Sequence, residues 1–352
     1  MGGDTETIKY AQAGVKRPAP AAPSSEHSPL RRPADEQPPQ ARLCIVVPCH
    51  NEEQSLPLFM DAMQSQAEPL APYLADLSYV FVDDGSSDGT LAVLKQLHEK
   101  NPSSHYVSFT RNFGKEAAFL AGLRTALGTG ATHIAVMDAD LQDPPSLLPE
   151  MLEKMRSTGA QVVAAYRTTR EGEPRMRSWF AHRFYHFINR VSDVHMRDGA
   201  RDFRIMRRPV VETIVAMPER CRFSKGLFMW GGFPTEWVGY ENAEREGGKS
   251  SWSFWKLARY AIEGIVSFSV VPLEAISVTG LVVFLLALVF LVIIIVRAAL
   301  FGDPVSGWPS LVCIITLFSG MLIFGMGVLG LYQSRIYQEI KQRPVYLVRE
   351  KQ

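Results

Sequence analysis

Short apolar runs and helical patterns alternate through the first half of the chain. Five mainly apolar runs, each ending in a polar cluster, occupy residues 43–48, 79–82, 106–109, 133–137 and 162–165. Runs of this length, rich in β-branched and aromatic residues, are typical of buried strands. Leucine and alanine recur at helical spacing between them, as in residues 91–97 and 117–126. Strands that alternate with helices in this way predict an α/β, Rossmann-like fold with a doubly wound, mostly parallel sheet.

Two long uncharged segments follow this pattern. Residues 275–296 and 304–334 contain no charged side chain, and each exceeds the roughly 20 residues that cross a bilayer. One such run is also found as a buried core helix. Two in succession, joined by a short connection, predict a transmembrane hairpin with helices over 273–298 and 308–333.

Charged and aromatic residues around the hairpin predict its orientation. Segment 334–352 carries five lysines and arginines against two glutamates. The positive-inside rule therefore places this basic tail, and the large domain at 42–250, in the cytoplasm. Residues 251–272 include two tryptophans among several other aromatic residues, which is typical of an interfacial amphipathic helix. We predict a multi-pass membrane protein whose large amino-terminal domain is cytoplasmic.

The remaining composition changes this picture little. Formal net charge is +1, so overall charge favours no class of partner. Residues 1–41 are rich in proline and alanine without an apolar run, which predicts a disordered tail and no secretory signal. The four cysteines stand apart and none forms a CxxC pair, so neither a disulfide framework nor a zinc site is expected.

A strongly basic segment at 166–208 contains eleven arginines, and its aromatic residues fall at helical spacing. A basic amphipathic helix suits an anionic membrane surface. A helix packed on the sheet with a solvated basic face is an equal alternative. Nucleic acid is not an expected partner, because the chain has a predicted membrane tether and no recognisable nucleic-acid module.

An acidic cluster follows the strand predicted at 133–137. It consists of Asp138, Asp140, Gln142 and Asp143, and a double proline then starts the next helix. The carboxyl edge of a parallel sheet is where open α/β folds bind ligands. Carboxylates at i and i+2 suit Mg²⁺ or Mn²⁺ held jointly with substrate phosphates. A lone Asp-x-Asp would more often be a solvated loop, with Asp143 capping the helix.

Further polar clusters follow the other predicted strands, and all should meet at the same sheet edge. Asp83 and Asp84 end the second strand and are candidates to accept hydrogen bonds from a nucleobase or ribose. An Asp-Gly turn without a ligand is the alternative. Residues 49–53 and 111–115 supply the neighbouring loops.

These motifs together resemble family 2 glycosyltransferases of GT-A fold. Within that family the chain is similar to polyisoprenyl-phosphate hexose transferases, namely dolichyl-phosphate mannose synthases and, more closely, bacterial undecaprenyl-phosphate glucosyltransferases of the GtrB type. The resemblance rests on the paired C-terminal spans and on motifs at 46–53, 82–90, 111–116, 137–145, 202–204 and 222–226. The lysine near the membrane, Lys249, is displaced by two positions from the usual motif. The Gln-x-x-Arg-Trp motif of processive synthases is missing, which favours transfer of a single sugar.

The resemblance implies a role for individual residues. Three residues would surround a divalent metal, Mg²⁺ or Mn²⁺: Asp138, Asp140 and Gln142. Residues implied in substrate binding are Pro48, Glu53, Asp83, Asp84, Lys115, Asp138, Arg167, Arg222 and Lys225. The residues expected to carry catalysis are Asp140, Asp202 and Arg204. Asp202 matches the position of a proposed base. A phosphate nucleophile is already largely ionised, with a second pKa near 6, so an orienting role for Asp202 stays equally open.

The function implied is inverting transfer of one hexose, expected to be glucose from UDP-glucose, onto undecaprenyl phosphate. The reaction would take place at the cytoplasmic face of the bacterial inner membrane and serve cell-envelope glycan modification. Alternative donors are UDP-aminoarabinose, a UDP-N-acetylhexosamine and GDP-mannose. A non-catalytic membrane protein that handles glycolipids is disfavoured, because the two spans carry no acid or base within the membrane. Glycines between 320 and 330 can support close helix packing, and the resemblance suggests a homo-oligomer, with a tetramer possible.

Overall fold

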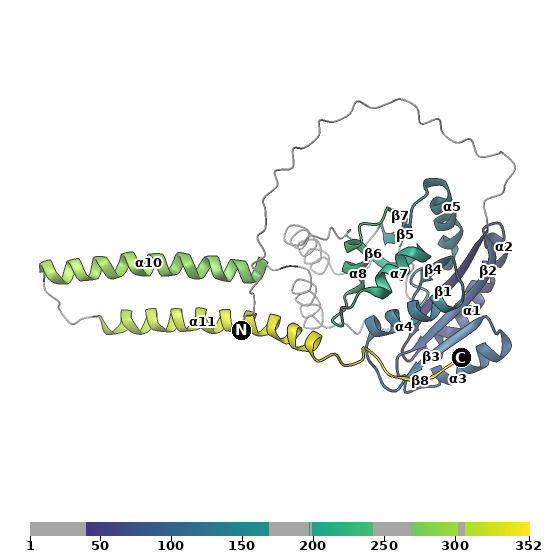
Figure 1. Ribbon diagram of the computed structural model, residues 1–352, viewed down its shortest axis with the longest axis horizontal. Helices are drawn as coiled ribbons and strands as arrows, with labels where there is room; N and C mark the ends of the chain where they lie inside the picture. The colour runs from purple at the N-terminus through teal and green to yellow at the C-terminus, as the bar shows by residue number, and fades with distance from the viewer. Residues whose placement is uncertain (1–39, 169–196, 198, 242–268, 270, 302–306) are drawn as a thin grey trace, which may run out of the picture. The chain divides into compact units, whose positions relative to one another are not determined.

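The described part of the chain forms an eight-stranded mixed sheet (Figure 1). The computed structural model describes residues 40–168, 197, 199–241, 269, 271–301 and 307–352. The spatial order of the strands is β7-β5-β6-β4-β1-β2-β3-β8. Their bounds are β1 (Ala41–Cys49), β2 (Leu74–Asp83), β3 (Ser104–Phe109), β4 (His133–Val136), β5 (Val162–Arg167), β6 (Ala200–Arg207), β7 (Thr235–Tyr240) and β8 (Val348–Lys351).

Helices cover both faces of this sheet and then continue into two long helices. The helices of the catalytic domain are α1 (Ser55–Gln64), α2 (Ala67–Leu70), α3 (Thr90–Lys100), α4 (Lys115–Gly128), the short 3₁₀ turn η1 (Pro145–Leu147), α5 (Leu148–Thr158), α7 (Arg208–Ala216) and α8 (Ser224–Trp230). Helices α10 (Val271–Phe301) and α11 (Trp308–Ile340) lie side by side (Figure 1).

Strand β1 shows why the sheet is buried on both sides. Alternate residues such as Ile45 and Val47 pack in the core under α1, α3 and α5. Val46 packs in the second core, under α4 and α7. Gly122 brings α4 directly onto the sheet, because a Cβ at this position would lie 2.2 Å from a methyl carbon of Val46. A strand buried on both faces reads as a continuous apolar run, which is the pattern seen in the sequence.

The predicted α/β class and mostly parallel sheet are confirmed. Strand β1 pairs in parallel with β2 and β4, β2 with β3, and β5 with β7. Strand β6 is antiparallel to both β4 and β5. The expectation of a helix across 166–208 is wrong for residues 200–207, which alternate between the two sheet faces as β6. Residues 169–196, which hold most of the predicted helix, lie outside the described residues.

Residues after α11 return to the catalytic sheet. Strand β8 pairs antiparallel with the edge strand β3, and the amide groups of Tyr106 and Gln352 exchange hydrogen bonds at 3.2 and 3.0 Å. Lys95 on α3 forms an ion pair with Glu350 at 2.9 Å. The segment 334–352, predicted only as a basic tail, therefore continues α11 as far as Ile340 and supplies one strand of the sheet.

The two long helices carry the apolar segments that the sequence predicts as spans. Within the described residues, one helical stretch, Leu317–Ile340, is long and apolar enough to cross a bilayer. Large apolar side chains stand exposed on both helices, including Leu286 at 64% and Ile323 at 70%. The two-span hairpin at 273–298 and 308–333 and the division into domains stay predictions. Residues 1–39 and most of the interfacial helix predicted at 251–272 lie outside the described residues.

Candidate active site

Strand pairing brings two distant aspartates together at one edge of the sheet. Strand β4 leads into Asp138, two residues after Val136. Strand β6 runs antiparallel to β4 with Arg204 opposite Val136, so the start of β6 lies at the edge where β4 ends. Asp202, two residues before Arg204, therefore lies near Asp138.

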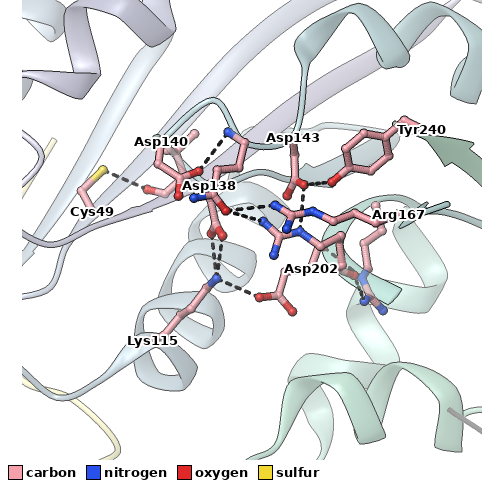
Figure 2. Close-up of polar contacts among 12 residues, drawn as sticks. Cys49, Lys115, Asp138, Asp140, Asp143, Arg167, Asp202 and Tyr240 are labelled. Carbon is pink, nitrogen blue, oxygen red and sulfur yellow. Dashed lines mark hydrogen bonds and ion pairs between the residues drawn. The ribbon is translucent and has the colours of Figure 1, made fainter. Parts of the chain in front are cut away.

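Lys115, the first residue of α4, bridges the two carboxylates. Its Nζ lies 2.8 Å from Asp138 and 2.8 Å from Asp202 (Figure 2). Burial alone would raise the pKa of Asp202, but the charges of Lys115 and Lys225 hold it well below its ordinary value. Burial raises the pKa of Asp138, and Lys115 only partly opposes this. Asp202 is thus a fixed anion at neutral pH.

Asp140 and Gln142 lie in a constrained loop directly after Asp138. Leu141 between them has φ 54°, a left-handed conformation that residues other than glycine rarely adopt. A carboxylate oxygen of Asp140 accepts the backbone N–H of Gln142 at 3.1 Å. The side-chain carbonyl of Gln142 accepts N–H groups from Arg167 at 3.0 Å and Arg201 at 3.3 Å. The predicted site residues Asp138, Asp140, Gln142 and Arg167 therefore gather in one cluster.

This cluster offers two carboxylates to a metal. Among the described residues, no group of three or more His, Cys, Asp and Glu side chains is placed to hold a metal ion. Asp138 and Asp140 fit an ion that takes its other oxygen ligands from substrate phosphates, as Mg²⁺ commonly does. The Gln142 carbonyl already accepts two arginine N–H groups. The donor set therefore fits a divalent cation through the two aspartates, and ligation by Gln142 stays a prediction.

Asp143 lies at the centre of a buried network that the sequence analysis did not predict as a site. Its side chain is 1% exposed and accepts the Nε–H of Arg201 at 2.9 Å. It also accepts the hydroxyl hydrogen of Tyr240 (Figure 2), whose pKa burial raises to about 12. Asp143 therefore joins the acidic loop to β6 and β7 rather than capping a helix. The only sequence signal was its place in the acidic run, because Arg201 and Tyr240 are distant in the chain.

Asp83 and Asp84 are buried and bonded to the protein's own loops. The two carboxylate oxygens of Asp84 accept the backbone N–H groups of Phe113 and Gly114 at 2.6 and 2.9 Å. Asp83 accepts the hydroxyl hydrogen of Ser108 at 2.7 Å. These contacts fix the loops after β2 and β3 against each other. Direct contact of either aspartate with a nucleoside stays a prediction.

The loops after β1 and β2 are joined by Glu53. One of its carboxylate oxygens accepts the N–H of Gly89 at 2.9 Å. Close packing of the loop after β2 requires glycine at Gly85, which has φ 62° and where a Cβ would lie 2.2 Å from the carbonyl carbon of Arg111. Pro48 pairs with β2 near the end of β1. Pro48 and Glu53, which are both predicted to contact substrate, thus lie at the carboxyl edge of the parallel strands.

Two of the predicted site residues, Arg204 and Arg222, make structural contacts. Arg204 is 2% exposed, donates to two main-chain carbonyls at the start of its own strand and lies 3.8 Å from the ring centroid of Phe228. Burial lowers its pKa to about 10. Arg222 donates to the main-chain carbonyls of Ile214 at 2.8 Å and Met217 at 3.1 Å, which closes the end of α7. Phosphate binding by either arginine stays a prediction.

Glu116 is a second acidic group beside Lys115, and the sequence analysis gave it no role. Its Oε2 accepts the backbone N–H of Ser224 at 2.8 Å and the Ser224 hydroxyl hydrogen. This contact ties the start of α4 to the start of α8, which carries Lys225. Burial raises the pKa of Glu116 from its ordinary 4.5 to about 7, so the side chain changes charge near neutral pH.

The Glu116→Gln variant is expected to flatten part of the pH dependence of stability. Between pH 4.5 and 7 the folded protein holds a proton on Glu116 that the unfolded chain has lost, so stability falls as pH rises. The Tm difference between the variant and the wild type should therefore grow by about 5 °C from pH 5 to pH 7.5. Differential scanning fluorimetry across this range measures it. Glu99→Gln, at an exposed site on α3, is the matched control, and a pH-independent difference for Glu116→Gln would contradict the prediction.

An open, mostly parallel sheet with loops that gather acidic and basic side chains at one edge is the form of an α/β enzyme. The chain belongs to glycosyl transferase family 2, whose sequence profile matches residues 44–215. The SfII prophage-derived bactoprenol glucosyl transferase of Shigella flexneri is 40% identical over 309 residues, covering 88% of this chain and 98% of that protein. The prophage bactoprenol glucosyl transferase homolog of Escherichia coli K12 is 40% identical over 308 residues, with coverages of 88% and 98%. The predicted family is confirmed, and the protein is a glycosyltransferase.

Two solved structures that match this chain share little of its sequence. A mannosyltransferase from Pyrobaculum calidifontis, in complex with GDP-Man and Mn²⁺, is 17% identical with a TM-score of 0.44, covering 89% of this chain and 90% of that one. Glucosyl-3-phosphoglycerate synthase from Mycobacterium tuberculosis, in complex with Mn²⁺, UDP-glucose and phosphoglyceric acid, is 18% identical with a TM-score of 0.40, covering 64% of this chain and 78% of that one.

Proposed function

We propose that the protein transfers glucose from UDP-glucose to undecaprenyl phosphate at a membrane surface. The observation that carries this proposal is the 40% identity to proteins named bactoprenol glucosyl transferases, across 98% of their length. The match therefore extends beyond the nucleotide-sugar fold into the long helices. The lipid acceptor is anionic, and a site that mixes carboxylates with lysines and arginines suits a reaction between two anions.

Repulsion between the donor diphosphate and the acceptor phosphate is the main electrostatic obstacle. It grows where a membrane lowers the dielectric constant. We propose that Asp138 and Asp140 hold a divalent cation, Mg²⁺ or Mn²⁺, which when bound would neutralise charge on the departing diphosphate. Lys115 lies between Asp138 and Asp202 and adds a positive charge on the side of β6. Direct attack by the acceptor phosphate would invert the anomeric centre.

The contacts of Asp202 favour an orienting role over that of a base. Lys115 holds its carboxylate at 2.8 Å, and the nearby cations keep its pKa well below the ordinary range. A group that ionises so readily is a weak proton acceptor at neutral pH. The acceptor phosphate, with a second pKa near 6, needs little help to ionise. We propose that Asp202 fixes Lys115 and that no general base is required.

The long helices support attachment to the bacterial inner membrane. Many large apolar side chains of α10 and α11 are exposed. Burying them in lipid would remove the free-energy cost of exposing them to water. We propose that α10 and α11 form the two-helix hairpin of a multi-pass protein, with the basic segment after α11 and the catalytic domain in the cytoplasm. A homo-oligomer, with a tetramer possible, is part of this proposal.

A donor panel tests the proposed function. Full-length protein in nanodiscs is incubated with undecaprenyl phosphate, Mn²⁺ and one ¹⁴C-labelled donor at a time, and lipid-linked label is counted. We expect UDP-glucose to exceed UDP-aminoarabinose, UDP-N-acetylglucosamine and GDP-mannose by at least about tenfold, because a pocket that hydrogen-bonds sugar hydroxyls rejects wrong isomers strongly. Faster transfer from another donor would replace the substrate. Absence of transfer from all four would favour a non-catalytic glycolipid-handling protein.

A further inference from the structure

The end of α11 is attached to the loop between α7 and α8 by one carboxylate. Glu339 accepts the backbone N–H of Arg220 at 3.0 and 3.1 Å through its two oxygens. It also accepts the N–H of Cys221 at 2.8 Å. Hydrogen bonds from amides to a carboxylate are among the stronger ones in proteins. A side chain from the long helix therefore satisfies two consecutive amides of a loop that has no regular structure of its own.

Neighbouring contacts strengthen this attachment. The Cys221 thiol lies 3.0 Å from the side-chain oxygen of Gln338. The guanidinium of Arg220 donates to the main-chain carbonyl of Arg343, just after α11. The polar residues of α11 that make these contacts follow the apolar stretch predicted to lie in the membrane. The loop is thus held where the helix would leave the lipid.

The same loop is held from its other side by the catalytic centre. Glu116, which directly follows Lys115 on α4, accepts two hydrogen bonds from Ser224 at the start of α8. Lys115 in turn contacts Asp138 and Asp202. A short chain of polar contacts therefore runs from Glu339 through the loop to the carboxylates of the active site.

A cavity of about 360 Å³ lies between the loop, the start of α4 and the end of α11. Among the described residues that line it, the cationic ones are Arg220, Arg222, Arg335, Lys341 and Arg343. Arg220 and Arg222 also donate to main-chain carbonyls, which fixes their guanidinium groups in place. Glu116 is the acidic residue among the described residues of this lining. Arg220 and Arg222 belong to the loop that Glu339 holds, so the spacing of the cations depends on that contact. Closely spaced cations at a membrane edge suit a phosphate carried by a lipid.

We propose that Glu339 is a positioning residue: it holds the loop between α7 and α8 so that the cations around this cavity receive the phosphate of the lipid acceptor. The inference rests on the proposed function and deepens it. In the described part of the chain, Asp83, Asp84 and Glu53 bond to Ser108, Phe113 and Gly89, and none of the three contacts Glu339. Its effect should therefore fall on the acceptor and not on the nucleotide sugar.

Steady-state kinetics of Glu339→Ala in nanodiscs test this assignment. We expect KM for undecaprenyl phosphate to rise about tenfold, because the lost charge-assisted hydrogen bonds together are worth at least that factor. KM for UDP-glucose should change less than about twofold, since donor contacts are untouched. Glu339→Gln keeps one carbonyl acceptor, so its KM for undecaprenyl phosphate should lie between those of the wild type and Glu339→Ala. Glu212→Ala, which removes an exposed ion pair with Arg208, is the matched control and should leave both KM values unchanged.

A second readout follows the loop itself and needs no turnover. Loss of the Glu339 contact should expose Cys221, because local opening of the loop no longer breaks the hydrogen bond to the carboxylate. The rate at which a maleimide labels Cys221 should therefore rise about tenfold in Glu339→Ala, which corresponds to one charge-assisted hydrogen bond. Peptide mass spectrometry separates Cys221 from the other thiols. If Glu339→Ala is not recovered folded, Glu339→Gln carries the same comparisons.

The outcomes separate this inference from the proposed function. A wild type that transfers glucose, with an acceptor KM unchanged in Glu339→Ala, overturns the positioning role whether or not labelling changes. Equal rises in both KM values, or a lowered Tm without rescue by Glu339→Gln, would make Glu339 merely structural. A wild type that transfers no sugar to the lipid refutes the proposed function and the positioning role with it. Faster labelling of Cys221 in that case still shows that Glu339 holds the loop.

Discussion

Replacing Asp140 by asparagine should lower kcat by about 1000-fold, because a metal that stabilises a departing diphosphate contributes several kcal/mol. The amide keeps the size of the side chain, and its oxygen can still accept the N–H of Gln142 seen at 3.1 Å. The change therefore removes charge while this hydrogen bond can be kept. Radiolabel transfer from UDP-[¹⁴C]glucose to undecaprenyl phosphate measures the loss, and circular dichroism with Tm checks the fold.

The control for this experiment is Asp61→Asn, an exposed aspartate on α1. It has the same charge change on the same fold and should retain full activity. Chelation by EDTA should reproduce the defect of Asp140→Asn in the wild type, and added Mn²⁺ or Mg²⁺ should restore activity. Full activity of Asp140→Asn, or of wild type in EDTA, would refute the role given to the two aspartates.

Replacing Lys115 by methionine should lower kcat about 100-fold, since each charge-assisted hydrogen bond it makes is worth about 1.5–3 kcal/mol. Methionine matches the length of the lysine but leaves Asp138 and Asp202 as like charges without the bridging cation. The two carboxylates then repel each other, so the pKa of Asp138, which burial raises and Lys115 lowers in the wild type, rises further. The acidic limb of the pH–rate profile should therefore move to higher pH, which kcat measured between pH 5 and 8 will show.

A double variant separates the two views of Asp202. If it orients Lys115, adding Asp202→Asn to Lys115→Met should cost little more activity and should recover Tm, because the unpaired charge is gone. If it is the base, the double variant should be much worse than Lys115→Met alone. Lys95→Met is the matched control: Lys95 has the same 44% side-chain exposure and one carboxylate partner. A surface ion pair of that kind contributes little.

The parallel half of the sheet and its loops could be predicted because each of these elements has a local sequence pattern. Val46 and its neighbours form an unbroken apolar run because β1 is buried on both faces. Asp138 follows such a run directly, so its place at the sheet edge follows from chain order. Lys115 could be placed near the site in the same way. These positions depend on short stretches whose apolar pattern and terminating polar residues are visible in the sequence.

The other features of the fold and the site depend on pairings between segments that are distant in the sequence. Arg201 and Asp202 lie in a basic segment that favours a helix by composition, and only pairing of β6 with β4 makes that part a strand. The side-chain carbonyl of Gln142 accepts N–H groups from Arg167 and Arg201, contacts that no local pattern indicates, and its role as a metal ligand stays a prediction. The roles of Asp143 and Glu339 were equally hidden, because their partners are set by tertiary contacts that leave no local pattern.

Strand β8 has a consequence for biosynthesis. It comes after both long helices, yet it covers β3, which would otherwise present unpaired amides at the edge of the sheet. Domains usually fold as the ribosome delivers them, amino-terminal part first. The edge of β3 therefore stays unpaired until both long helices have left the ribosome. If these helices form the proposed hairpin, a nascent chain stalled before residue 348 would expose an aggregation-prone strand edge, which quality control would recognise as a sign of incomplete synthesis.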